Sequence, residues 1–143
     1  MEIKPRIGFD NIKFGMYRKE IVEILGEPDQ IIEDAYDNEE NILIWNKLKI
    51  SLTFQSNDRF TFYSSKNRDL KFNGKTFMDL EIEAAKSEVF GELKADWEIE
   101  DYETFKTHFY EDIWLTLHCE YGNVSNFELG VPFKNETEFD FPE

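Results

Sequence analysis

Histidine and cysteine, which supply many metal ligands and catalytic pairs, are rare in this chain. The histidines are His108 and His118, and the single cysteine, Cys119, directly follows the second of them. Neither a third histidine nor a second cysteine completes the ligand set of a zinc site. His118 and Cys119 cannot act as a base and nucleophile pair, because adjacent residues of a strand point to opposite faces. We therefore predict a non-enzymatic protein with no catalytic residues, no metal site and no cofactor.

Other enzyme motifs are missing or misplaced. The sequence has no Gly-rich phosphate loop, and its 31 Asp and Glu are too numerous to single out a glycosidase pair. Pro28-Asp29 resembles the start of a nuclease motif, but the triplet Asp69-Leu70-Lys71 that would complete it lies far along the chain. An enzyme of unrecognised type remains one alternative.

The charge of the chain is strongly one-sided. Its 31 acidic and 16 basic residues give a formal net charge of −15. Such a charge repels nucleic acids and anionic membranes and attracts basic proteins. It would also keep a chain with 14 Phe soluble. We expect a basic protein partner, and neither a nucleic acid nor a membrane.

Two acidic segments with interleaved tyrosines are candidate contacts for that partner. Carboxylates hold Lys and Arg side chains by charge-assisted hydrogen bonds. The alternative is that both segments are solvated loops, and the residue order of an EF-hand is absent. The candidates are Glu33, Asp34, Tyr36 and Asp37 in the first segment and Glu100, Asp101 and Tyr102 in the second.

The segments 48–54 and 113–119 alternate most strictly between apolar and polar residues, as half-buried strands do. Aromatic side chains dominate the energetics of protein interfaces. We therefore predict that Trp114, His118 and Glu120, which lie opposite the apolar side of the second segment, belong to a binding face. The alternative is that the other half of the chain or the C-terminal tail covers Trp114. The equivalent polar positions in the first segment are Lys49, Ser51, Thr53 and Gln55.

The elements that carry these residues recur at an offset of 65 positions, which pairs Trp45 with Tyr110 and Leu52 with Leu117. Such a recurrence predicts a repeated unit. The predicted fold class is α+β, with two tandem repeats, each a helix packed on a short antiparallel β-meander. The repeats span 1–68 and 69–134, and an acidic tail covers 135–143. The predicted helices are 17–25 and 80–90, and the predicted strands are 31–36, 42–45, 48–54 and 60–63, followed by 97–101, 105–110, 113–119 and 124–129.

The facing of two strands depends on a loop length. A two-residue turn at Asn46-Lys47 directs Trp45 to the core and Ile44 outward. The equivalent turn in the second half directs Phe109 outward. A three-residue loop reverses this facing. For the second half we favour the longer loop, because Lys106 and His108 are poor core residues.

Residues 14–29 resemble a known sequence signature. Phe14-Gly15-Met16 leads into a helix that ends at Leu25-Gly26-Glu27-Pro28-Asp29, and Trp45 and the strand Ile50, Leu52, Phe54 follow it. This pattern resembles the superfamily of the β-lactamase-inhibitor protein and the outer-membrane small lipoprotein A family. The resemblance implies a tandem repeat of a helix and a meander. The second half departs from it, because no Pro-Asp follows Gly91 and no clear Gly-Met precedes its helix.

We combine these observations into a functional hypothesis. The chain begins with neither a signal peptide nor a lipidation cysteine, so we expect a cytoplasmic protein. Its predicted function is that of a protein-binding module, such as a bacterial immunity or inhibitor protein that neutralises a basic partner. The main alternative is a domain that binds a small apolar ligand between the two halves.

Overall fold

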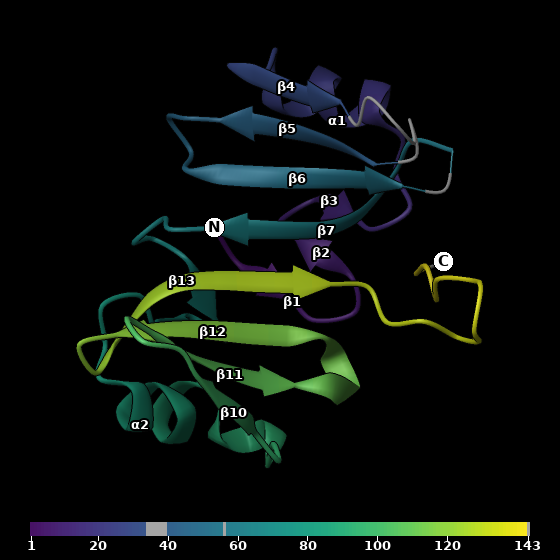
Figure 1. Cartoon of the computed structure of the whole chain (residues 1–143). Coiled ribbons are helices and arrows are strands. Elements are labelled where there is room, and N and C mark those ends of the chain that lie inside the picture. Colours follow the sequence, from purple (N-terminus) through teal and green to yellow (C-terminus); the bar gives the residue numbers. More distant parts are fainter. Residues whose placement is uncertain (34–39, 56, 143) are drawn as a thin grey trace.

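A computed structural model describes residues 1–33, 40–55 and 57–142 (Figure 1). Its main feature is one antiparallel sheet of eight strands in the order β10-β11-β12-β13-β7-β6-β5-β4. The first half of the chain supplies β4 (Gln30–Glu33), β5 (Asn41–Trp45), β6 (Ile50–Gln55) and β7 (Arg59–Ser65). The second half supplies β10 (Glu98–Asp101), β11 (Lys106–Tyr110), β12 (Leu115–Glu120) and β13 (Asn123–Gly130).

Smaller elements cover one face of this sheet. They are the strands β1 (Ile3–Lys4), β2 (Gly8–Phe9), β3 (Ile12–Lys13), β8 (Lys71–Phe72) and β9 (Lys75–Thr76), and the helix α1 (Arg18–Leu25). Three short turns of helix complete the layer: α2 (Ile82–Ala84), a π-helical turn (Ala85–Val89) and a 3-10 turn (Gly91–Leu93). A second 3-10 turn (Glu111–Ile113) connects β11 to β12. Among the described residues, no helix is both long and apolar enough to cross a membrane.

The core lies between the sheet and this layer and is rich in aromatic side chains. The ring of Tyr63 on β7 lies 4.9 Å from that of Phe9 on β2 and 5.6 Å from that of Phe127 on β13. The Tyr63 hydroxyl donates a hydrogen bond of 2.8 Å to the Gly8 carbonyl, which satisfies a polar group in a fully buried position. The strands β1–β3 therefore pack across the centre of the sheet, behind β7 and β13 in the view of Figure 1.

The predicted fold class is wrong. The eight long strands fall close to the predicted segments, but they do not form two separate helix-and-meander repeats. The edge strands of the two meanders pair directly, with Phe127 of β13 opposite Ser65 of β7 and Gly130 opposite Phe62, so the sheet is continuous. The structure is mostly β, and within the described ranges only α1 is a regular helix of more than one turn.

The helix predicted at 80–90 has three α-helical residues followed by a π-helical turn. Its residues give a physical reason for this difference. Ile82, Ala85 and Val89 are buried at spacings of three and four, whereas Lys86 lies between them and also turns toward the sheet. The π-helical turn is wider than an α-helical turn, so Ala85 and Val89 can both lie in the core although Lys86 stands between them. π-bulges inside α-helices often have such a local role.

The preferred facing of the second half is also wrong. The loops between β5 and β6 and between β11 and β12 span four residues, because Trp45 pairs with Ile50 and Tyr110 with Leu115. A four-residue loop keeps the facing of a two-residue loop. Trp45 therefore points to the core, and His108, expected to be a poor core residue, is only 3% exposed. Ile44 and Phe109 point to the other face.

Candidate functional site

The face of the sheet away from the core layer carries several of the predicted binding residues. On the strands β10–β13, strand register sets the side chains of this face in rows. Glu100 lies opposite Thr107, which lies opposite His118, and Thr116 lies between Phe109 and Glu128. We call the following set the acidic-aromatic face: Glu100, Tyr102, Phe105, Trp114, His118 and Glu128.

A stack of rings crosses the acidic-aromatic face. The Tyr102 ring lies 4.7 Å from the Phe105 ring at an interplanar angle of 16°, and the Phe105 ring lies 5.8 Å from the His118 imidazole at 26°. Such nearly parallel offset rings hold one another in place. The stack offers flat apolar surfaces at the side of the molecule that carries the exposed strand β10.

Carboxylates hold both ends of this stack. The Tyr102 hydroxyl donates a hydrogen bond of 2.6 Å to Glu100 Oε2, and His118 Nε2 lies 2.5 Å from Glu128 Oε1. The hydrogen bond to Glu100, together with the charge of that carboxylate, raises the pKa of Tyr102. Each carboxylate keeps lone pairs for another donor. The site can therefore receive a cationic side chain that lies on a ring and donates to a carboxylate.

Trp114 lies at one end of the acidic-aromatic face and contacts the segment that follows β13. Its backbone is left-handed, with φ of 55°, and its ring packs edge-on against Phe109 at 5.5 Å and Phe133 at 6.0 Å. Phe133 precedes the predicted tail at 135–143, so this contact does not test the alternative that the tail covers this tryptophan. The ring also lies over Gly130, where a Cβ atom would stand 2.6 Å from Trp114 Cδ1.

The structure does not bring Glu33, the described residue of the first acidic segment, to the second segment. Glu33 ends β4 at one edge of the sheet, while Glu100 and Asp101 belong to β10 at the opposite edge. Eight strands at the usual spacing put these edges about 34 Å apart. Glu33 also faces Arg18, with 3.9 Å between charged atoms. Asp34, Tyr36 and Asp37 lie outside the described residues.

The other predicted residues have separate positions. Asp101 is exposed and lies 3.9 Å from Lys106 on the core-layer side, and Glu120 is exposed at the end of β12. Cys119 is buried on the core side, and burial raises the pKa of its thiol. Among the described residues, no group of three His, Cys, Asp or Glu side chains could hold a metal ion.

Sequence reasoning missed two residues of the acidic-aromatic face, Phe105 and Glu128. For Glu128 a signal was present, because Phe127 and Leu129 read as core residues and place it on the opposite face. Its pairing with His118 across β12 and β13 required the strand register. Phe105 lies inside the predicted strand 105–110, and the longer loop favoured for the second half turned it to the core, so it was missed together with the facing of that strand.

The comparisons with known proteins give information on the fold alone. No protein family and no curated protein matches this sequence. A solved structure of an extracellular protein containing a SCP domain, from Bacillus anthracis, is similar with a TM-score of 0.52 at 12% sequence identity. The match covers 82% of this chain and 43% of that one, so this chain spans less than half of its structural neighbour.

This neighbour and the single sheet correct the resemblance drawn from residues 14–29. The chain was expected to share the fold of the β-lactamase-inhibitor protein and the outer-membrane small lipoprotein A family. The similar structure is of a different kind, and the architecture is mostly sheet instead of tandem helix-and-meander units. The signature describes one helix end and one strand, which is too little to determine how sheets join.

Proposed function

We propose that this chain is a non-enzymatic protein-binding module that binds a basic partner protein through its acidic-aromatic face. The observation that carries the proposal is the Tyr102–Phe105–His118 stack with a carboxylate at each end. An arginine can stack on a ring and donate hydrogen bonds to a carboxylate at the same time. A lysine can make the same approach with a single ammonium group.

The charge of the whole chain supports a basic partner. A net charge of −15 attracts a basic protein from a distance and speeds the formation of the first encounter. The aromatic side chains then supply the short-range energy, because anchors of this type dominate interfaces. We propose that this binding neutralises a basic toxin or enzyme, as the binding of an immunity or inhibitor protein does.

Site-specific photo-crosslinking tests this proposal. A benzoylphenylalanine replaces Tyr102, which is 45% exposed on the acidic-aromatic face, and in a control variant it replaces Tyr17, which is 44% exposed at the start of α1. Cells of the source organism that express either variant are irradiated, and mass spectrometry identifies the crosslinked proteins.

We expect one basic protein to crosslink at position 102 and not at position 17. Its purified form should bind the unmodified chain, and Phe105→Ala should weaken this binding by about tenfold or more, as the loss of an interface anchor does. Equal crosslinking at both positions, or a partner whose affinity is unchanged by Phe105→Ala, would show that the binding surface lies elsewhere.

A further inference from the structure

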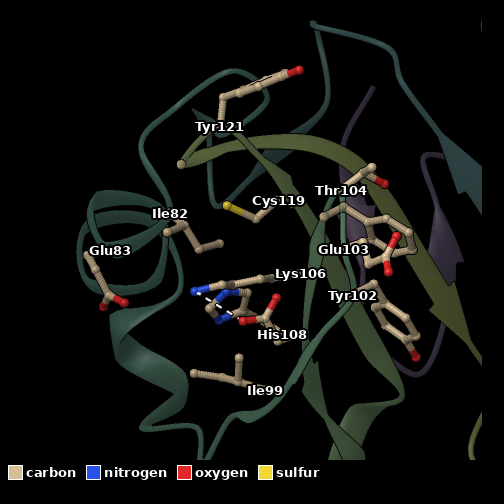
Figure 2. Close-up of a pocket in the computed structure, with 13 residues that line it drawn as sticks. Ile82, Glu83, Ile99, Tyr102, Glu103, Thr104, Lys106, His108, Cys119 and Tyr121 are labelled. Carbon is tan, nitrogen blue, oxygen red and sulfur yellow. Dashed lines mark ion pairs between the residues drawn. The ribbon is translucent and has the colours of Figure 1, made fainter.

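A pocket of about 430 Å³ lies on the other side of the sheet, beneath α2 and beside β10–β12 (Figure 2). Its volume falls in the range of small-molecule sites. Ile82, Ile99 and Cys119 give it apolar walls. At its rim, Lys106 Nζ and Asp101 Oδ2 lie 3.9 Å apart, and both side chains are largely exposed.

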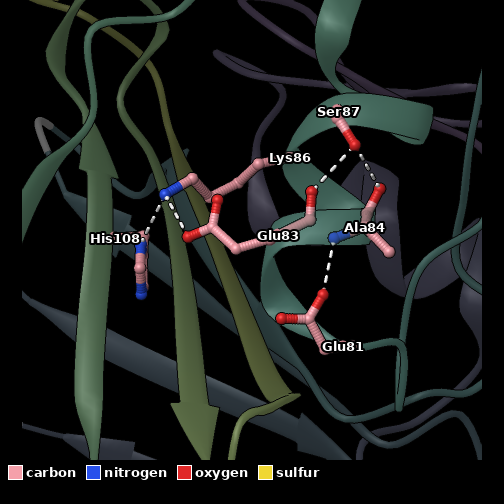
Figure 3. A network of polar contacts seen from close by, with 6 residues as sticks. All are labelled: Glu81, Glu83, Ala84, Lys86, Ser87 and His108. Carbon is pink, nitrogen blue, oxygen red and sulfur yellow. Dashed lines mark hydrogen bonds and ion pairs between the residues drawn. The ribbon is translucent and has the colours of Figure 1, made fainter.

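His108 is buried, lines this pocket and belongs to a polar network with Lys86 and Glu83 (Figure 3). Lys86 Nζ lies 3.3 Å from His108 Nδ1 and 3.3 Å from Glu83 Oε1, and only 13% of the Lys86 side chain is exposed. An ammonium group can only donate hydrogen bonds, so Nδ1 is the acceptor in this contact. The proton of the neutral imidazole is therefore on Nε2.

The surroundings of His108 keep the ring neutral. Burial lowers the pKa of His108 most strongly, and the charge of Lys86 has the next largest effect in the same direction. The charge of Glu83 raises this pKa, and Lys106 lowers it by less than Glu83 raises it. A neutral ring with Nδ1 engaged presents one N–H group, at Nε2. Among the described residues, this buried nitrogen has no hydrogen-bond partner. A buried donor without an acceptor is costly, and a bound acceptor removes that cost.

The other half of the sheet shows that packing does not require this polar pair. β5 and β11 have the same length and lie 65 positions apart, so Leu43 corresponds to His108, and the same offset makes Ile21 on α1 the counterpart of Lys86 in sequence. Both Leu43 and Ile21 are fully buried. The first half thus has two apolar side chains at these positions. The second half has a lysine and a histidine there, and their burial carries a desolvation cost.

The charges around the pocket restrict what can bind. Glu83, Asp101 and Glu103 face it with only Lys106 as a positive lining residue, and the whole chain is strongly acidic. An anionic ligand is repelled by this field. The required acceptor must therefore come from an uncharged group, and the apolar walls favour a ligand with a hydrocarbon body.

We propose that this pocket binds a small uncharged compound with an apolar body and a carbonyl oxygen, which accepts a hydrogen bond from His108 Nε2–H. Lys86 is a positioning residue, since its ammonium group fixes the imidazole tautomer that presents the donor. This site opens on the core-layer side of the sheet, and Tyr102 and Phe105 of the acidic-aromatic face also belong to its lining.

The test uses the purified chain and a matched pair of probes. Cyclohexanone has a carbonyl oxygen on a six-membered ring, and methylenecyclohexane has the same shape with a CH₂ group in place of the oxygen. Imidazole 15N spectra follow the two histidines, with His118 as the internal reference. We expect His108 to show the Nε2–H tautomer, and its Nε2–H proton to move downfield with cyclohexanone alone. A probe of this size should bind with Kd on the order of millimolar.

A double variant separates binding from folding. Lys86→Ile with His108→Leu installs the residue types of positions 21 and 43, so it should fold with an unchanged or raised Tm. It should bind cyclohexanone at least tenfold more weakly than the unmodified chain. The proposal is overturned if His108 carries its proton on Nδ1, if both probes shift its signals equally or not at all, or if the double variant binds cyclohexanone as well as the original.

Discussion

At the scale of single residues, Gly130 shows how closely the acidic-aromatic face is packed. A Cβ atom at this position would stand 2.6 Å from Trp114 Cδ1 and 3.2 Å from Phe62 Cδ2. Gly130→Ala should therefore displace Trp114 and lower the free energy of unfolding by about 1–3 kcal/mol, as overpacking does. Urea denaturation measures this change. The control is Gly91→Ala, where the added Cβ would lie 4.0 Å from the Lys86 carbonyl oxygen, and a similar loss there would contradict the packing argument.

His108 supplies a second prediction at this scale. Its pKa is lowered in the folded chain, so the unfolded chain binds the proton first as pH falls below about 6.5. Stability should thus be constant above that pH and decrease below it, with a slope of at most about 1.4 kcal/mol per pH unit from this residue. Urea denaturation between pH 5 and pH 8 measures the slope. The Lys86→Ile, His108→Leu double variant should have a smaller slope, and an equal slope would assign the effect to other groups.

At the scale of elements, the pairing of β7 with β13 joins the two halves of the sheet. Phe127 is fully buried at this junction and contacts Tyr63 and Phe77, at 5.6 and 5.5 Å between ring centroids. Phe127→Ala should lower the free energy of unfolding by about 3–5 kcal/mol. Both halves should still unfold in one transition when fluorescence and circular dichroism are followed together. Phe133→Ala, at a position after β13 that is 48% exposed, is the matched control and should cost much less.

The same junction shows what the sequence could and could not predict. Alternation located β6 and β12 and their buried faces, because Leu52, Leu117 and their neighbours follow the period of a half-buried strand. Alternation contains no information on which edge strand pairs with which, so the union of β7 and β13 was missed. Strands of two residues, such as β1–β3, are too short to show a period. The acidic-aromatic face was predicted in part, through His118 and Trp114, and its carboxylate Glu128 required the register.

At the scale of the whole molecule, a charge of −15 should make salt act in opposite directions on folding and on binding. Counterions screen repulsion within the folded chain, so added NaCl should raise its Tm. They also screen attraction to a basic partner, so between about 50 and 500 mM NaCl the Kd of the complex should rise by roughly tenfold or more. Calorimetry with the crosslinked partner, once purified, measures this dependence.

Two variants with the same net charge locate the origin of the salt dependence. Glu100→Gln with Glu128→Gln removes two carboxylates from the acidic-aromatic face, and Glu92→Gln with Glu136→Gln removes two from exposed positions away from it. The first variant should weaken binding at low salt and reduce the salt dependence, because it removes the groups that pair with the partner. The second should bind nearly as the original does, since it changes only the distant field. If both lose affinity equally, the partner responds to total charge, and the ring stack with its two carboxylates is not the binding site.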